Sequence, residues 1–475
     1  MGMRITLYHV LAALLAFPSL FMFFSHWGVD GVPSSWMSGD HPAHFYKTYL
    51  VYLGTTRAVH WYNVDLFPIS PAFFGISWVF TRVIPDSVLA YKFIVMLSDV
   101  LLVAVAVLLP VSAPAILVLQ YMNISHGVIP TVYAFVFGFI AAWYALRLSR
   151  WWESFIVLAL FVLSLFFQPT VGGIFFLLLA LIYVDRVLRA DLSSLHLLVI
   201  FVAAGVIGLY YSVIVSTYPN LRFSLRLWTH VHPSFSSPYF WFAGNLPVYL
   251  WAELYVLIIS LLSALYLLYR KKWLYGTFLL GTWLYFVLGP AIPGLRFLPV
   301  ASAFPYVYLT FLLYASSVLL YRINPRFLLV ILFFSLIFVW DLYESLQPWF
   351  RQYTWRDLSL EDATQMCGDV VRSHSIAYIF SCSSGNCNPY WMATAYLNAE
   401  YNILTPQGWI VEIMPSTTYR DLSSIEAYCE RGDVNALHLF LKEKNAFLIL
   451  IVNGEWNSPL LSSAVCRYRS VYFID

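Results

Sequence analysis

Long apolar segments recur along most of this chain and leave few folds open to it. A helix needs about 20 apolar residues to cross the hydrocarbon core of a bilayer. Charged residues make up only 11% of the 475 residues, against about 25% in soluble domains. The segments that meet this requirement are 4–24, 67–84, 87–109, 129–148, 153–171, 172–187, 196–216, 246–269, 273–292, 302–321 and 326–345. We therefore predict an α-helical polytopic membrane protein with about eleven spans.

Segment 111–126 is apolar but too short to cross a bilayer. Pro110, Pro114 and Pro130 interrupt this region, and proline inside a helix breaks or kinks it. We predict a re-entrant or interfacial helix here. The triplet Asn123-Ile124-Ser125 in the same segment matches a glycosylation sequon, a pattern that also arises often by chance.

The basic residues in the connections indicate the orientation. Cytoplasmic connections carry an excess of Lys and Arg, and a cytoplasmic N-terminus places every basic turn on that side. These turns hold Arg82, Arg147, Arg150, Arg186, Arg189, Arg270, Lys271, Lys272, Arg322 and Arg326. The loops 25–66 and 217–245, the turn around Arg296 and the C-terminal region then face outward. The sequence thus predicts a multi-pass protein of the cell membrane with an extracytoplasmic C-terminal domain.

Cysteine usage divides the chain in two. All five cysteines lie near the C-terminus: Cys367, Cys382, Cys387, Cys429 and Cys466. This asymmetry predicts a transmembrane domain over 1–346 and an extracytoplasmic domain over 347–475. In an oxidising compartment, the Cys382 and Cys387 thiols would close a short loop. We expect Cys367 to stay unpaired because it falls in a predicted helix.

The C-terminal domain alternates helix and strand patterns. Segment 358–373 predicts a helix that leads into a strand at 376–381. Segment 433–445 likewise predicts a helix that leads into a strand at 446–452, and segment 467–474 predicts a final strand. A helix followed by a short apolar strand, used repeatedly, is typical of a small α/β domain.

A cluster of acidic and histidine residues, Gly39-Asp40-His41-Pro42-Ala43-His44, follows the first predicted span. Charged groups near a membrane are expensive and are therefore candidates for function. The residues after Asp40 predict a short interfacial helix with His44, Lys47 and Thr48 on one side. Asp40 stands at its start, where the helix dipole favours a negative charge. The alternative role for Asp40 is that of an N-cap.

The outer loop and a later turn together resemble the GT-C superfamily of membrane glycosyltransferases. In that superfamily the first span leads to an essential acid, an interfacial helix and an aromatic, Pro-rich approach to the second span. Asp40 and its helix are similar to the first two parts, and segment 62–71, which contains Asp65, is similar to the third. Segment 293–299 (Pro-Gly-Leu-Arg-Phe-Leu-Pro) resembles the superfamily's Arg-aromatic-Leu-Pro segment and supplies Arg296.

The resemblance implies an enzyme that transfers a sugar from a polyprenyl (dolichyl) phosphate to a glycan, lipid or protein acceptor at the outer face. Asp40 would be the catalytic base with His44 beside it, and Arg296 would bind the donor phosphate. The other residues of the substrate and lipid-phosphate site are His41, Lys47, Asp65, His230 and His232. No cofactor is expected, although the two histidines of His230-Val231-His232 leave a divalent metal open.

Two other functions stay open at this point. A lipid or solute transporter would carry polar residues at mid-membrane, and Asp99 lies in the middle of its predicted span. A catalytically inactive scaffold of the same architecture would use its external domain to bind a partner. The net charge of +2 gives no indication of a nucleic-acid partner.

Overall fold

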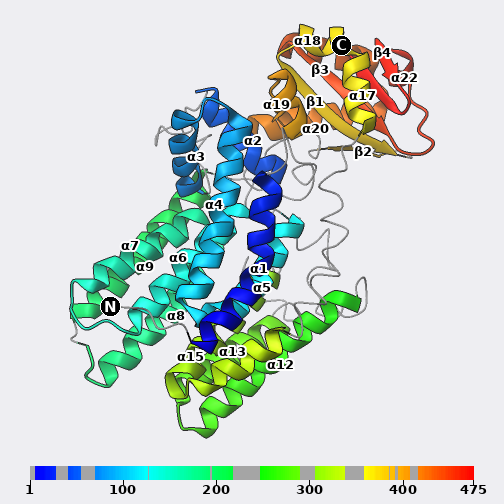
Figure 1. Ribbon diagram of the computed structural model, residues 1–475. Coiled ribbons are helices and arrows are strands. Elements are labelled where there is room, and N and C mark those ends of the chain that lie inside the picture. The colour runs from blue at the N-terminus through cyan, green and yellow to red at the C-terminus, as the bar shows by residue number, and fades with distance from the viewer. Residues whose placement is uncertain are drawn as a thin grey trace. The chain divides into compact units, whose positions relative to one another are not determined.

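The computed structural model describes residues 6–27, 41–54, 70–126, 128–192, 195–217, 247–288, 305–336, 358–383, 386–390, 394–406 and 416–475. Within these residues the protein is mostly helical and carries a small β-sheet near its C-terminus (Figure 1). Contacts group the chain into two compact units. The first unit comprises Met1–Trp27, Ile69–Phe73 and Val95–Gln347, and the second comprises Gly28–Pro68, Phe74–Ile94 and Pro348–Asp475. The predicted domain boundary after residue 346 lies outside the described residues.

The helices outside the C-terminal region follow the apolar segments. They are α1 (Leu7–Trp27), α3 (Pro71–Val83), α4 (Ser87–Leu108), α5 (Ala113–His126), α6 (Ile129–Ala145), α7 (Glu153–Phe167), α8 (Pro169–Leu188), α9 (Leu195–Thr217), α12 (Pro247–Tyr269), α13 (Trp273–Leu288) and α15 (Pro305–Ile323). A further apolar helix covers Arg326–Leu336. Within the described ranges, three helices are both long and apolar enough to cross a membrane: α1, α4 and α8.

Two boundaries show how local chemistry sets the helix ends. The predicted boundary between the spans 153–171 and 172–187 is wrong, because the second helix, α8, begins at Pro169. Proline fits the first turn of a helix. A Cβ atom added at Gly172 would lie 2.5 Å from the Leu165 Cα. Only glycine therefore permits the close approach of α7 and α8 at this turn. The short segment 111–126 forms a 3₁₀ turn at Pro110–Ser112 followed by α5.

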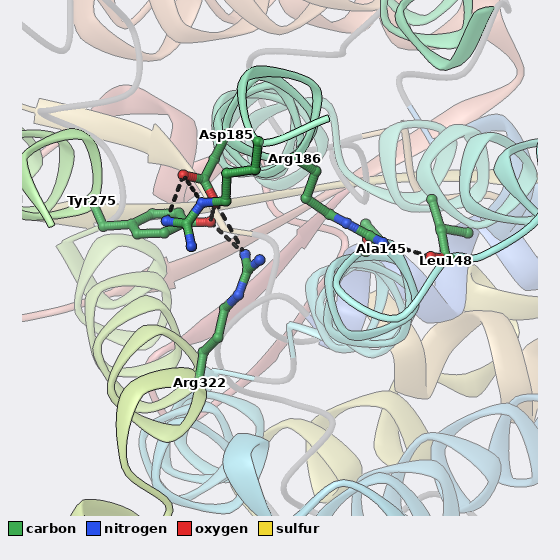
Figure 2. A network of polar contacts seen from close by, with 7 residues as sticks. Ala145, Leu148, Asp185, Arg186, Tyr275 and Arg322 are labelled. Carbon is green, nitrogen blue, oxygen red and sulfur yellow. Dashed lines mark hydrogen bonds and ion pairs between the residues drawn. The ribbon is translucent and has the colours of Figure 1, made fainter. Parts of the chain in front are cut away.

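A polar network in the first unit joins the ends of three helices (Figure 2). The Asp185 carboxylate on α8 accepts a hydrogen bond from the Tyr275 hydroxyl on α13 and lies 3.4 Å from the Arg322 guanidinium on α15. Arg189, the residue that directly follows α8, also donates to this carboxylate at 2.9 Å. These contacts fix the ends of α8, α13 and α15 to one another.

Arg186 adds a second connection in the same network. Its guanidinium donates to the carbonyl oxygens of Ala145 and Leu148 at 2.9 and 2.6 Å (Figure 2). Ala145 is the last residue of α6, where helix geometry leaves the last carbonyls without partners, and Leu148 lies three residues further along the chain. A cation here also complements the negative end of the helix dipole. Arg186 therefore ties α8 to the end of α6.

The second unit combines an N-terminal helical part with the C-terminal α/β fold. Its N-terminal part contains α2 (His41–Tyr52), most of α3 and the first residues of α4. The C-terminal helices are α17 (Leu358–Met366), α18 (Gly368–Ser373), α19 (Thr394–Tyr401), α20 (Ser416–Arg431), α21 (Val434–Lys444) and α22 (Pro459–Ser462). The strands are β1 (Ile376–Ser383), β2 (Asn386–Pro389), β3 (Ala446–Val452), β4 (Cys466–Tyr468) and β5 (Val471–Ile474).

The five strands form one mixed sheet in the order β2-β1-β3-β5-β4. The central strand β3 pairs parallel with β1 and antiparallel with β5. Because side chains alternate along a strand, Ile379, Phe447 and Phe473 share one face and pack with residues of α17 and α19. On the other face, the Tyr378 ring centroid lies 6.0 Å from that of Phe440 on α21. Helices thus cover both faces, as expected for a small α/β domain.

The structure corrects two predictions in this region. Cys367 is not free: it forms a disulfide with Cys466, and the unpaired cysteine is the buried Cys429. The predicted loop closure by Cys382 and Cys387 is confirmed. The predicted final strand over 467–474 is wrong, because it is a hairpin of β4 and β5 that turns at Arg469 and the residue after it.

Candidate functional site

The helix predicted after Asp40 is present as α2, and its polar side is buried. Ten of its 12 residues are buried, including His41, His44 and Lys47. With 3.6 residues per turn, these three positions cover an arc of about 120° on the helix. Lys47 is only 2% exposed, and lysine is almost never fully buried unless it is paired. The structure therefore gathers two imidazoles and an ammonium group on one buried face.

Neighbouring helices of the same unit hold this face in position. The His41 Nδ1 atom lies 3.0 Å from the Tyr91 hydroxyl of α4. The Thr48 hydroxyl lies 3.1 Å from the Ser77 hydroxyl of α3. The Phe45 ring packs edge-on against the Tyr91 ring, with centroids 5.7 Å apart. Hydrogen bonds and aromatic packing therefore fix the rotation of α2 about its own axis.

The C-terminal fold also contacts α2. The Tyr49 hydroxyl donates to the Asn402 Oδ1 atom at 2.6 Å, and α2 packs against α19. Asn402 follows α19 directly and has a positive φ of 56°, a conformation in which asparagine is enriched. The helix that carries the basic face is therefore attached to the α/β fold by a buried tyrosine.

The electrostatics of α2 suit an anionic ligand. Burial, followed by the positive charges of Lys47 and His41, holds the pKa of His44 well below its usual value of 6.5. His44 is therefore a neutral imidazole at neutral pH, able to donate through one ring nitrogen and to accept through the other. A phosphate near this face would meet a buried ammonium group and two imidazoles, and its negative charge would raise the pKa of His44.

Most of the other predicted site residues lie outside the described residues. These are Asp40, Asp65, His230, His232 and Arg296. The structure therefore brings together His41, His44 and Lys47, and the placement of the acid, the phosphate-binding arginine and the His-x-His pair stays a prediction. Within the described parts of the chain, no group of three or more His, Cys, Asp or Glu side chains is arranged to hold a metal ion.

The sequence missed three partners of α2: Ser77, Tyr91 and Asn402. Ser77 and Tyr91 fall inside apolar segments, where a single polar residue forms no sequence pattern. Asn402 is about 350 residues away from α2, and no local motif connects them. Only the folded chain reveals these contacts.

A second group of buried polar residues lies in the first unit. The Asn123 Nδ2 atom of α5 lies 3.4 Å from the Asp99 Oδ1 atom of α4, and Asn123 is only 5% exposed. A glycosylated asparagine lies on the surface, so the buried side chain of Asn123 does not fit the sequon reading. Asp99 lies inside a helix long and apolar enough to cross a membrane.

Comparison with known proteins assigns no family to this architecture. No family model matches the chain, and no curated protein or solved structure matches it.

Proposed function

We propose that the chain is a membrane glycosyltransferase that moves a sugar from a polyprenyl phosphate to an acceptor at the outer face of the membrane. The observation that carries this proposal is the buried basic face of α2, formed by His41, His44 and Lys47. It directly follows Asp40 in the sequence. Sugar transfer of this kind needs a carboxylate base near the acceptor and cationic groups near the leaving phosphate.

Each residue of the site has a role that follows from its chemistry. Asp40 accepts the proton of the attacking acceptor hydroxyl or amide. The new glycosidic bond forms at the anomeric carbon as its bond to the phosphate oxygen breaks, and the phosphate leaves with the electron pair. Lys47 and Arg296 stabilise the charge on that phosphate, because charge-assisted hydrogen bonds are about twice as strong as neutral ones. His44 donates to a phosphate oxygen or orients Asp40.

The architecture supports a membrane location for this reaction. Three helices within the described residues, α1, α4 and α8, are long and apolar enough to cross a membrane; eleven spans with a cytoplasmic N-terminus are part of this proposal. The disulfides Cys367–Cys466 and Cys382–Cys387 lie in the C-terminal fold, and disulfides persist in oxidising compartments. This supports an extracytoplasmic position for that fold, on the side where the lipid-linked donor presents its sugar.

The test is sugar transfer by the purified full-length protein in lipid. Labelled polyprenyl-phosphate sugars serve as donors and membrane extract as the acceptor, and wild type is compared with Asp40→Asn and Lys47→Met. Asp40→Asn should abolish transfer. Lys47→Met should reduce it about tenfold to a hundredfold, the value of one charge-assisted hydrogen bond. The matched control is Lys442→Met, because Lys442 is an exposed lysine of α21 in the same unit.

Two results would contradict the proposal. Wild-type protein that transfers no sugar from any donor would refute the function. Sugar transfer that persists unchanged in both Asp40→Asn and Lys47→Met would still identify a glycosyltransferase, but it would refute the assignment of its active site to Asp40 and α2.

A further inference from the structure

Contacts inside the first unit bring two basic connections together. The first joins α12 to α13 at 270–272, and the second follows α15 at 322–326. The Tyr266 ring, near the end of α12, lies 4.7 Å from the Phe327 ring, centroid to centroid. The two connections are therefore neighbours at one end of these helices.

The connections carry five cations, which form the basic end of the first unit: Arg270, Lys271, Lys272, Arg322 and Arg326. Among the residues that the structure describes, Arg322 is the only one of the five in an ion pair, at 3.4 Å from the Asp185 carboxylate (Figure 2). That carboxylate is also paired with Arg189. One carboxylate cannot balance these cations, so the basic end has an excess of positive charge.

Two exposed aromatic side chains flank the first connection. Tyr269 is the last residue of α12 and is 81% exposed, and Trp273 is the first residue of α13 and is 64% exposed. Tyr and Trp are enriched at the boundary between membrane and water, because their rings have both apolar and polar parts. Their position beside the cations indicates that the basic end lies at the headgroup level of a bilayer.

The backbone of Lys271 gives an independent indication. Its N–H donates to the Leu268 carbonyl oxygen at 2.9 Å, and the Lys272 N–H donates to the Leu267 carbonyl oxygen at 2.9 Å. This pair of hydrogen bonds closes a helix with one left-handed residue, which is usually glycine. Lys271 occupies that position with a φ of 56°. The turn itself therefore gives no reason for a lysine, whose exposed side chain adds charge to the surface.

We propose that the basic end binds the headgroup phosphates of anionic phospholipids in the surrounding leaflet. Guanidinium and ammonium groups hold phosphate through charge-assisted hydrogen bonds, and basic residues at the ends of membrane helices attract anionic headgroups. A lipid fits better than a free anion, because the exposed rings of Tyr269 and Trp273 offer apolar contact to its acyl chains.

The proposal rests on the proposed membrane location of the chain, but it does not depend on sugar transfer. The basic face of α2 belongs to the second unit, so the two sites are distinct. Arg322 links the basic end to α8 through Asp185 and to α13 through the Tyr275 hydroxyl. Anionic lipid bound here is therefore expected to stabilise the first unit.

The test uses the purified full-length protein in micelles of a neutral detergent. Phosphatidylglycerol is added in increasing proportion, with phosphatidylcholine as the neutral comparison, and thermal unfolding is followed by tryptophan fluorescence. We expect a saturable rise in Tm with phosphatidylglycerol that phosphatidylcholine does not reproduce, because a ligand that binds only the folded state stabilises it. The rise should shrink at about 1 M salt, where the Debye length is about 3 Å. This measurement requires no variant to fold.

Lys271→Gly separates lipid binding from the stability of the turn. Glycine suits the left-handed backbone, so the Tm of this variant without anionic lipid should equal or exceed that of wild type. The half-saturating proportion of phosphatidylglycerol should nevertheless rise about fivefold, the contribution of one basic residue near an anionic membrane surface.

A double variant tests both connections together. Arg270→Gln/Arg326→Gln should raise the half-saturating proportion about tenfold or more. The matched control is Arg372→Gln/Arg420→Gln, which removes two exposed arginines of the C-terminal fold and should leave the lipid response unchanged.

Three results would overturn the proposal. They are the same Tm with the two lipids at every proportion, a wild-type lipid response in both Lys271→Gly and Arg270→Gln/Arg326→Gln, and a rise in Tm that inorganic phosphate alone reproduces in full. Failure of sugar transfer would leave the lipid response intact. A protein that stays soluble without detergent would refute the membrane location on which this proposal rests.

Discussion

The two disulfides of the C-terminal fold should stabilise it to very different extents. Cross-linking removes loop entropy from the unfolded chain, and this effect grows with the number of residues enclosed. Cys367 and Cys466 are 99 residues apart, whereas Cys382 and Cys387 are five residues apart. The chain-entropy relation gives about 4.7 kcal/mol for the long loop and about 2 kcal/mol for the short one. Removing the long-loop disulfide should therefore cost more than twice as much.

The comparison is between two double-alanine variants of the full-length protein. Cys367→Ala/Cys466→Ala should lower the free energy of unfolding of the fold by about 4–5 kcal/mol, and Cys382→Ala/Cys387→Ala by about 2 kcal/mol. Hydrogen exchange of β3 amides in increasing urea measures this free energy, because β3 is the central strand. Cys429→Ala is the control: it removes a buried thiol without opening a loop. Equal losses in the two double variants, or a larger loss for the short loop, would refute the reasoning.

Three further variants test the described contacts. The pKa of His44 is lowered in the folded state, so below about pH 6.5 the unfolded chain gains a proton that the folded chain does not. The Tm of wild type should therefore fall between about pH 7.5 and about pH 5.5. The Tm of His44→Gln should fall less over the same range. Tyr49→Phe should cost about 1 kcal/mol and speed amide exchange in α19, while Tyr52→Phe, at a side chain 40% exposed, should not. Asp185→Asn should lower the free energy of unfolding by about 3 kcal/mol or more, which is detected as a fall in Tm. Arg189→Gln should lower it by at most about 1 kcal/mol, because the Arg189 side chain is 40% exposed.

The sequence was most informative where a pattern is local. Apolar runs predicted the helices, and the helix-then-strand order predicted β1 and β3 because each is a short apolar segment after a helix. The hairpin of β4 and β5 was missed because its turn requires Arg469 at a positive φ of 52°, which few non-glycine residues adopt. The pairing of Cys367 was missed because it depends on how a distant strand packs against α17, and spacing alone does not contain that information.

The candidate site was predictable only in part for the same reason. The helical spacing of His44 and Lys47 placed them on one side of α2 before the fold was known. Their burial, and the contacts to Tyr91 and Asn402, come from segments about 50 and 350 residues away.

The long sequence separation between Cys367 and Cys466 has a consequence for biosynthesis. β1 and β2 form a local hairpin closed by Cys382 and Cys387, so this disulfide can form as soon as both cysteines have been synthesised. The partner of Cys367 is made 79 residues after Cys387, which at 5–20 residues per second corresponds to a delay of about 4–16 s. During that interval Cys367 is exposed to incorrect pairing with the cysteines already made. At the proposed outer face of the membrane, correct pairing of Cys367 would require a thiol isomerase, or oxidation of the local hairpin before Cys367 reacts.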